Sequence, residues 1–278
     1  MSAATFRTAG IADVETMLEW AAREGWNPGE EDAAAFHAAD PEGFLLAEVG
    51  GTLAAAISVV NHSDEFAFLG FYICRPEFRG RGIGFALWRH ALAHAGNRTV
   101  GLDGVADQEA NYRRSGFERA GASVRYEGRL TAKPEAAVRG IRPTDAAAIA
   151  ALDMAANGVQ RPAFLSAWTA DTPTRKTLVL DGPNGPRGYA TIRRCREGVK
   201  VGPIVAEGAD DAIALAQAAL DVLPAETAVI DIPSSNDALR QRLVARGFRD
   251  TFATARMYRG TPPTTLPLLQ AIGTMELG

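Results

Sequence analysis

The sequence predicts a mixed α/β protein made of two copies of one domain. Its 278 residues exceed the roughly 100–150 residues at which single domains cluster, so two domains fit the length. Landmarks of the first half return in the same order in the second half, 131 to 133 positions later. Strand-like and helix-like segments alternate within each half, which is typical of a sheet covered by helices and not of a helical bundle.

The repeat is carried by four landmarks that keep both order and spacing. They are Arg7 with Arg139, the strand-like runs that begin at Phe44 and Thr177, Gly116-Phe117 with Gly247-Phe248, and the segments that begin at Arg125 and Arg256. Chance matches of single residues do not keep a common spacing, so the pattern indicates a duplication. We expect domains at residues 1–130 and 138–278, joined by a polar stretch that contains Pro134.

The composition is that of a globular protein and excludes several classes. With 47% hydrophobic and 22% charged residues, each half can bury a core, so wholesale disorder is excluded. A net charge of −4 argues against nucleic acid as a main partner. Cys74 and Cys195 lie too far apart for a Cys-x-x-Cys site. Neither a signal peptide nor a membrane span is visible, so we expect a cytoplasmic protein without a membrane partner.

The elements of the first half follow from hydrophobic periodicity and from turn residues. The expected strands are residues 5–9, 43–49, 52–60, 66–74, 99–104 and 117–126, and the expected helices are residues 11–24, 30–39, 82–95 and 108–115. Gly50-Gly51 between two apolar runs indicates a hairpin, and Gly96 is a typical helix end. Residues 66–74 are almost all apolar or aromatic, which predicts a central strand buried on both faces.

The most informative segment joins this central strand to the next helix. Gly80, Gly82 and Gly84 allow a turn whose backbone N–H groups converge at the positive end of a helix, which is a binding site for phosphate. Positive side chains are added by Arg75, Arg79 and Arg81. The glycine spacing matches neither G-x-x-x-x-G-K-[ST] nor G-x-G-x-x-G, so a Walker loop is excluded and a dinucleotide-dependent oxidoreductase is remote.

The same segment resembles motif A of the GCN5-related N-acetyltransferases (GNAT), [QR]-x-x-G-x-[GA], which follows a strand that ends near a proline, here Pro76. The matching residues are Arg79, Gly82 and Gly84. A second family motif, Y-x-x-x-G-F, is matched by residues 112–117 and is preceded by Asn111. Three features resemble a bacterial subgroup in which such a domain is followed by a diverged second one: residues 102–105, the Arg125-Tyr126 pair and the ending at residues 275–278.

The resemblance implies a GNAT-like fold for both domains and acetyl-CoA as the co-substrate. Its pyrophosphate is expected on the backbone amides of the glycine loop, and its pantetheine arm along the edge of the central strand. The residues expected to bind it are Ile73, Cys74, Arg79, Gly80, Arg81, Gly82, Ile83, Gly84, Asn111 and Tyr112. The acceptor is expected to be a primary amine of a small molecule or peptide, acetylated directly in a ternary complex.

Acetyl transfer to an amine uses an acid for the leaving thiolate and a base for the amine. By resemblance, Tyr112 is the acid. Many relatives carry a glutamate in the central strand, but residues 66–74 hold no carboxylate, so Asp103 at the end of the neighbouring strand is the first candidate for the base. Alternatives are Glu65, Glu276 or a water chain. The residues expected around the acceptor are Trp26, Asn27, Asp103, Arg161 and Met257. Plain packing is the alternative for Trp26, Asn27, Arg161 and Met257. For Asp103, the alternative to a base is an anchor of the Gly104 turn or a carboxylate that fixes the ammonium group of the substrate.

The second copy departs from the first at the informative positions. Its loop, residues 201–211, has no arginine, and it carries Asp210 and Asp211 where phosphates would bind. Leu243 stands at the position of the motif tyrosine. Because like charges repel, we expect the second domain to have lost the co-substrate site and to shape the acceptor pocket or to stabilise the first domain.

Other candidate sites are weaker. His90 and His94 lie one helical turn apart without a third ligand, so a solvated helix face is favoured over a metal site. Cys74 near a thioester invites an acetyl-cysteine route, but no partner histidine is visible. The alternative to an enzyme is a non-catalytic acyl-CoA-binding sensor or interaction protein, which the missing strand glutamate keeps open.

Overall fold

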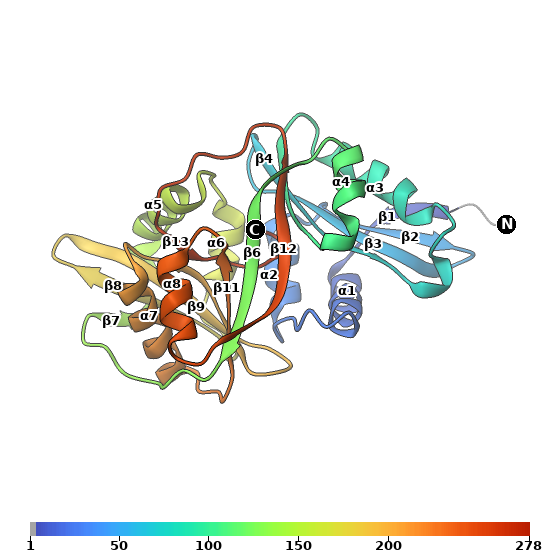
Figure 1. Cartoon of the computed structure of the whole chain (residues 1–278). Helices are drawn as coiled ribbons and strands as arrows, with labels where there is room; N and C mark the ends of the chain where they lie inside the picture. The colour runs from blue at the N-terminus through green and yellow to red at the C-terminus, as the bar shows by residue number, and fades with distance from the viewer. Residues whose placement is uncertain (1–3) are drawn as a thin grey trace.

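The protein, seen in a computed structural model, forms one long β-sheet with helices on its faces (Figure 1). The structure describes residues 4–278; Met1–Ala3, which begin the segment searched for a signal peptide, lie outside the described residues. Within the described part of the chain, no helix is long and apolar enough to cross a membrane.

The first half has the mixed order that its periodicity predicts. Its elements are β1 (Ala4–Thr8), α1 (Ile11–Arg23), α2 (Asp32–Ala39), β2 (Phe44–Val49), β3 (Thr52–Asn61), β4 (Phe66–Cys74), α3 (Ile83–His94), β5 (Thr99–Gly104), α4 (Glu109–Arg114) and β6 (Glu118–Gly128). In α1, Val14, Met17, Leu18 and Ala21 recur at helical spacing, and all four are buried. The mixed α/β fold class is thereby confirmed.

The second half repeats this order with small variations. Its elements are β7 (Val138–Gly140), α5 (Ala146–Asn157), α6 (Pro162–Trp168), β8 (Arg175–Gly182), β9 (Gly185–Arg194), β10 (Val199–Val205), α7 (Ala209–Val222), β11 (Ala228–Pro233), α8 (Asp237–Val244), β12 (Arg249–Arg259) and β13 (Leu269–Ala271). The short strand β13 has no counterpart in the first half and pairs with β10.

The two halves exchange strands at the centre of the sheet. The strand order there is β5-β12-β6-β11, so β12 of the second half lies next to β5 of the first, and β6 of the first half lies next to β11 of the second. Figure 1 shows β6 and β12 side by side at the middle of the molecule. A boundary near residues 130–138 therefore separates the halves in sequence but not in space.

Each exchanged strand carries an arginine that binds an aspartate of the other half. Arg256 of β12 lies opposite Asp103 of β5 in the register, and its Nη2 donates to Oδ2 of Asp103 over 2.6 Å. Arg125 of β6 lies opposite Asp231 of β11, with Nε to Oδ1 at 2.8 Å and Nη2 to Oδ2 at 2.9 Å. The duplication thus includes a buried ion pair that joins the halves.

A second contact between the halves is aromatic and charged. Trp168 of α6 stacks on Phe36 of α2 with the ring centroids 5.6 Å apart. The guanidinium groups of Arg175 and Arg193 lie 4.6 and 4.5 Å from the Trp168 ring, and both bind the buried carboxylate of Asp32. Cation–π contacts and paired charges together fix α2 against the second half.

The central strand of each half opens away from its neighbour at a bulge. Pairing of β4 with β5 ends at Leu69 opposite Leu102, and Phe71 then adopts a φ of 49°. Pairing of β10 with β11 covers only residues 199–200, and the register of β10 shifts between residues 201 and 204. Beyond each bulge, backbone groups of the central strand are free of the next strand and can bind another chain or a ligand.

Candidate active site

The predicted phosphate loop lies between β4 and α3. Gly80 and Gly82 have φ angles of 72° and 76°, in the left-handed region that favours glycine, and Gly82 is the N-cap of α3. Gly84 has little room for a side chain, because a Cβ there would lie 2.9 Å from the hydroxyl oxygen of Tyr72. The loop thus places the positive end of a twelve-residue helix beside β4.

The three arginines near the loop have different roles. Nε of Arg79 donates to the backbone oxygen of Cys74 over 2.7 Å, and its Nη2 binds Glu24. Arg75 pairs with Glu77. Among residues 4–278, Arg81 makes no ion pair; it lies over the Phe78 ring at 5.3 Å. Arg81 is therefore the cation of this loop that is free for a phosphate, whereas Arg79 ties the strand end to α1.

An open groove of about 580 Å³ runs along β4 and the loop. The residues expected to bind the co-substrate that line it are Ile73, Cys74, Arg79, Gly80, Gly82, Ile83 and Gly84. Asn111 and Tyr112 line an adjoining hollow of about 400 Å³ together with Phe85 and Trp88. Burial raises the pKa of the Cys74 thiol, which keeps it protonated and disfavours a covalent acetyl-cysteine.

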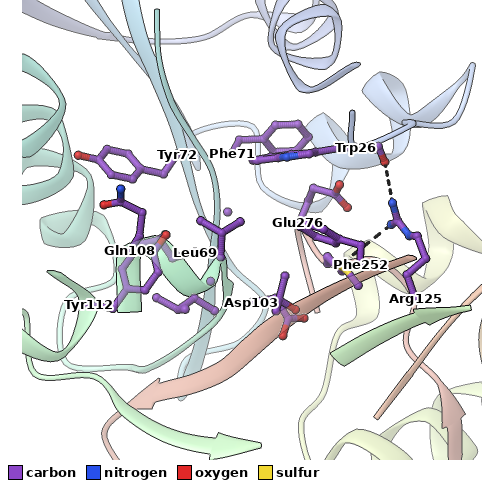
Figure 2. A pocket seen from close by; sticks show the side chains of 16 residues that line it. Trp26, Leu69, Phe71, Tyr72, Asp103, Gln108, Tyr112, Arg125, Phe252 and Glu276 are labelled. Carbon is purple, nitrogen blue, oxygen red and sulfur yellow. Dashed lines mark hydrogen bonds between the residues drawn. The ribbon is translucent and has the colours of Figure 1, made fainter. Parts of the chain in front are cut away.

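A smaller cavity of about 80 Å³ lies at the inner end of the groove. The two spaces adjoin, because both are lined by Trp26, Tyr72, Val105 and Gln108. Figure 2 shows Tyr72, Gln108 and Tyr112 on one side of the cavity and Trp26, Glu276 and Arg125 on the other. Apolar walls with a few polar groups are typical of a small-molecule site.

Tyr112 lies between the cavity and the adjoining hollow, and it lines both. Its ring stacks on Trp88 with the centroids 5.4 Å apart, and burial raises the pKa of its phenol. A Cβ on Gly104 would lie 2.2 Å from the Tyr112 ring, which explains the glycine in the predicted Leu102–Val105 segment. The raised pKa holds the phenol in its protonated form, which can donate a hydrogen bond.

Asp103 lines the cavity, but its carboxylate is already paired. Both oxygens accept hydrogen bonds from Arg256, at 2.9 and 2.6 Å, and Oδ1 also accepts one from Ser123. Its side chain is fully buried. To take a proton from a substrate, Asp103 would have to weaken a buried ion pair, so the geometry favours a structural role over that of a base.

Glu276 is the second carboxylate in the cavity wall, and it comes from the end of the chain. Its Oε2 accepts a hydrogen bond from the Thr274 hydroxyl, and among the described residues no cation lies within ion-pair distance of it. Its backbone reaches β4 so closely that a Cβ on Gly70 would lie 2.1 Å from the Glu276 oxygen. Glu276 therefore offers the less committed carboxylate of the two.

Three residues expected around the acceptor lie elsewhere and need correction. Asn27 donates through Nδ2 to the backbone oxygen of Glu197 and joins the two halves. Arg161 is buried in an ion pair with Asp153. Met257 is fully buried in the core of the first half, because adjacent residues of a strand face opposite sides and Arg256 takes the cavity side. Trp26 does line the cavity.

Several cavity residues were not singled out by the sequence. They are Leu69, Tyr72, Gln108, Arg125, Phe252, Thr254 and Met275. Tyr72 and Leu69 lie in a strand whose apolar character hides which side chain faces a ligand. Phe252 and Thr254 reach the cavity only because β12 crosses into the first half. The Arg125-Tyr126 pair and the Met275–Gly278 ending were visible signals, but only as features of a subgroup.

The corresponding region of the second half is built differently. At the start of α7, Asp211 pairs with Arg187 and Asp210 pairs with Arg242. Leu243 is fully buried in the core of that half. Carboxylates in the first turn of this helix would repel a phosphate, which agrees with the expected loss of the co-substrate site.

Two tandem domains with a glycine loop, an opened central strand and a buried tyrosine define an acyltransferase of the GNAT type. Residues 11–117 match the acetyltransferase (GNAT) family profile, and residues 149–269 match the acetyltransferase (GNAT) domain profile. Over 278 residues the chain is 34% identical to holothin acyltransferase of Pseudoalteromonas sp. (strain SANK 73390), covering 99% of this chain and 94% of that one. The chain belongs to the GNAT acetyltransferase family, whose acyltransferases generally use acyl-CoA.

Solved structures support the tandem fold. A candidate acetyltransferase of Pyrococcus horikoshii matches with a TM-score of 0.82 at 20% identity, over 99% of this chain and 96% of that one. A tandem GNAT protein from the clavulanic acid biosynthesis pathway matches with a TM-score of 0.63 at 16% identity, over 95% and 100% of the two chains. At these identities the likeness concerns the fold alone.

Proposed function

We propose that the protein transfers an acetyl group from acetyl-CoA to a primary amine, directly and within a ternary complex. The observation that carries the proposal is the position of Tyr112, a buried phenol that lines both the cavity and the adjoining hollow. Two features of the groove support acetyl-CoA as the donor: the start of α3, next to the unpaired Arg81, suits the pyrophosphate, and the free edge of β4 suits the pantetheine amides.

Direct transfer is supported by the four residues that the groove and the cavity share. An amine held in the cavity attacks the thioester carbonyl, and its surplus N–H proton leaves to water, directly or through a carboxylate of the wall. The C–S bond breaks, and the Tyr112 hydroxyl gives its proton to the departing thiolate. Tyr112 regains a proton from water after product release. No side chain needs to carry the acetyl group, because Cys74 is held as a thiol.

The cavity walls support a small acceptor with an apolar body. Trp26, Phe71 and Phe252 supply aromatic surface, and about 80 Å³ leaves little room for a bulky group. The Glu276 carboxylate at the wall suits the amino group of such an acceptor. A peptide acceptor could place only its N-terminal residue in the cavity, because the rest of its chain would have to extend into the groove.

The test is turnover of a Tyr112→Phe variant with acetyl-CoA and a panel of primary amines. The panel includes holothin, the compound after which the relative in Pseudoalteromonas is named. We expect kcat to fall by about 10²-fold or more, because a positioned acid contributes roughly that much, while acetyl-CoA still raises the melting temperature. Tyr126→Phe, a phenol in the core of the second half, is the matched control and should keep full activity. Full turnover by Tyr112→Phe contradicts the assignment of the acid.

A further inference from the structure

The last eleven residues, here called the tail (residues 268–278), occupy the opening between β10 and β11. The tail strand β13 pairs with β10, with Ala271 opposite Ile204 and Leu269 opposite Val205. On the other side, the Ile272 amide donates to the backbone oxygen of Asp231 in β11 over 2.9 Å. The tail thus fills the opening that, in the first half, lies along the predicted co-substrate groove.

The same tail then covers the opened strand of the first half. A Cβ on Gly202 of β10 would lie 2.2 Å from the oxygen of Ile272, and a Cβ on Gly70 of β4 would lie 2.1 Å from the oxygen of Glu276. These two glycines are 132 positions apart, which is the spacing of the repeat. Each central strand therefore admits the tail backbone at the equivalent position.

The tail is held firmly on both sides of Glu276. Before it, the Gln270 side chain donates to the backbone oxygen of Ala206 over 3.1 Å. After it, Nε2 of His62 donates to the oxygen of Leu277 over 2.8 Å, and Nη1 of Arg161 donates to that of Gly278 over 2.5 Å. Leu277 is fully buried in the core next to α2. The Glu276 backbone therefore has a fixed place between two anchors.

The charges near Glu276 are already committed to other partners. Arg125 binds Asp231, Arg193 binds Asp32, and Lys200 donates to the backbone oxygen of Trp26 over 2.9 Å. Asp103 on the far wall is neutralised by Arg256. Glu276 thus faces the cavity with a neutral hydroxyl as its hydrogen-bond partner, so an amine can approach it without displacing a cation.

We propose that Glu276 is a catalytic residue that takes the proton of the acceptor amine, and that the opened strand β10 acts through the tail as its positioning element. This inference rests on the proposed function. As the amine nitrogen forms its bond to the carbonyl carbon, one N–H proton passes to the Glu276 carboxylate and leaves to water after the product departs. The diverged half thereby supplies one of the two proton-transfer groups of the reaction.

The first test compares Glu276→Gln with Glu65→Gln, a carboxylate that is exposed and lies outside the cavity. We expect Glu276→Gln to lower kcat by about 10²-fold or more, with the acetyl-CoA affinity unchanged, and Glu65→Gln to leave kcat unchanged. If Glu276→Gln keeps kcat and only raises the acceptor KM, Glu276 binds the amine without taking its proton, and the proposal is wrong.

The second test displaces the tail at β10, away from the cavity. Gly202→Ala puts a Cβ against Ile272, whereas Gly208→Ala, in the same strand-to-helix connection, meets nothing within 4 Å. We expect Gly202→Ala to lower kcat about tenfold, and Gly208→Ala to leave it unchanged. In the Glu276→Gln background, Gly202→Ala should cause no further loss, because both changes act on one group. Additive losses contradict positioning through Glu276.

A replacement variant and the activity of the unaltered protein make these outcomes interpretable. If Gly202→Ala does not fold, Gln270→Ala removes a tail anchor by truncation and replaces it in the same double-variant comparison. If the unaltered protein acetylates no amine of the panel, the proposed function fails. If the unaltered protein is active and Glu276→Gln is equally active, only the present inference fails.

Discussion

The opened strands β4 and β10 are equivalent by sequence spacing, and the difference between them explains the division of labour. β4 leads into a glycine loop with a free arginine and an open groove. β10 leads to Gly208 and to two aspartates that are paired with arginines, and its opening is filled by the tail. One fold therefore serves as a binding site in the first half and as a support for the tail in the second.

A second comparison concerns the two ion pairs across the exchanged strands. Asp103 with Arg256 lies at the candidate site, and Asp231 with Arg125 is its counterpart on the other side of the sheet centre. The pair is present in the half that lacks the glycine loop as well as in the half that has it. A role common to both is joining the halves, which argues for structure and against proton transfer by Asp103.

The largest effect on stability is expected when these ion pairs are broken one at a time. Asp103→Asn and Asp231→Asn each leave a buried arginine without its carboxylate, so each should lower the free energy of unfolding by about 3–5 kcal/mol. Denaturant unfolding of both variants measures this directly. An Asp103→Asn variant as stable as the unaltered protein but without turnover would restore Asp103 as the base.

A smaller effect is expected on the pH dependence of stability, because only one end of the tail is held by a group that titrates. Burial lowers the pKa of His62 from 6.5 to about 4, while the bonds of Gln270 and the backbone amides at the other end do not titrate. Below pH 6.5 the unfolded chain takes up a proton at His62 that the folded chain refuses, so stability falls by up to about 1.4 kcal/mol per pH unit until pH 4.

His62→Gln keeps a donor for Leu277 and removes this titration. Its free energy of unfolding should therefore change less between pH 6.5 and pH 4.5 than that of the unaltered protein. Denaturant melts of both proteins at the two pH values give the comparison. An identical pH dependence would mean that His62 is not the group that titrates.

The sequence predicted the parts of the molecule that local patterns determine. The elements of the first half lie within two residues of their expected ends, because periodicity and glycine turns set them locally. The glycine loop and the absence of arginine from its second copy were visible as residue types. Tyr112 was assigned by a motif, and its role as the acid stays a prediction.

Long-range pairing decided what the sequence did not predict. In the exchange, β5 pairs with β12 and β11 pairs with β6, each across the two halves. The hydrophobic alternation of β6 and β12 does not indicate which of the two strands each neighbour pairs with. That choice puts Phe252 at the cavity, turns Met257 to the core and engages Asp103 with Arg256. The tail has little regular structure, and its place depends on close backbone approach at Gly70 and Gly202, which no local pattern indicates.

The division of labour is tested most directly by calorimetric titration of acetyl-CoA into the full chain. We expect one binding site per chain. Arg81→Glu should weaken binding about tenfold, or about 1.4 kcal/mol, and Arg89→Glu on the exposed face of α3 should not. Two sites per chain, or equal binding by Arg81→Glu, would contradict the claim that the first half alone binds the co-substrate at this loop.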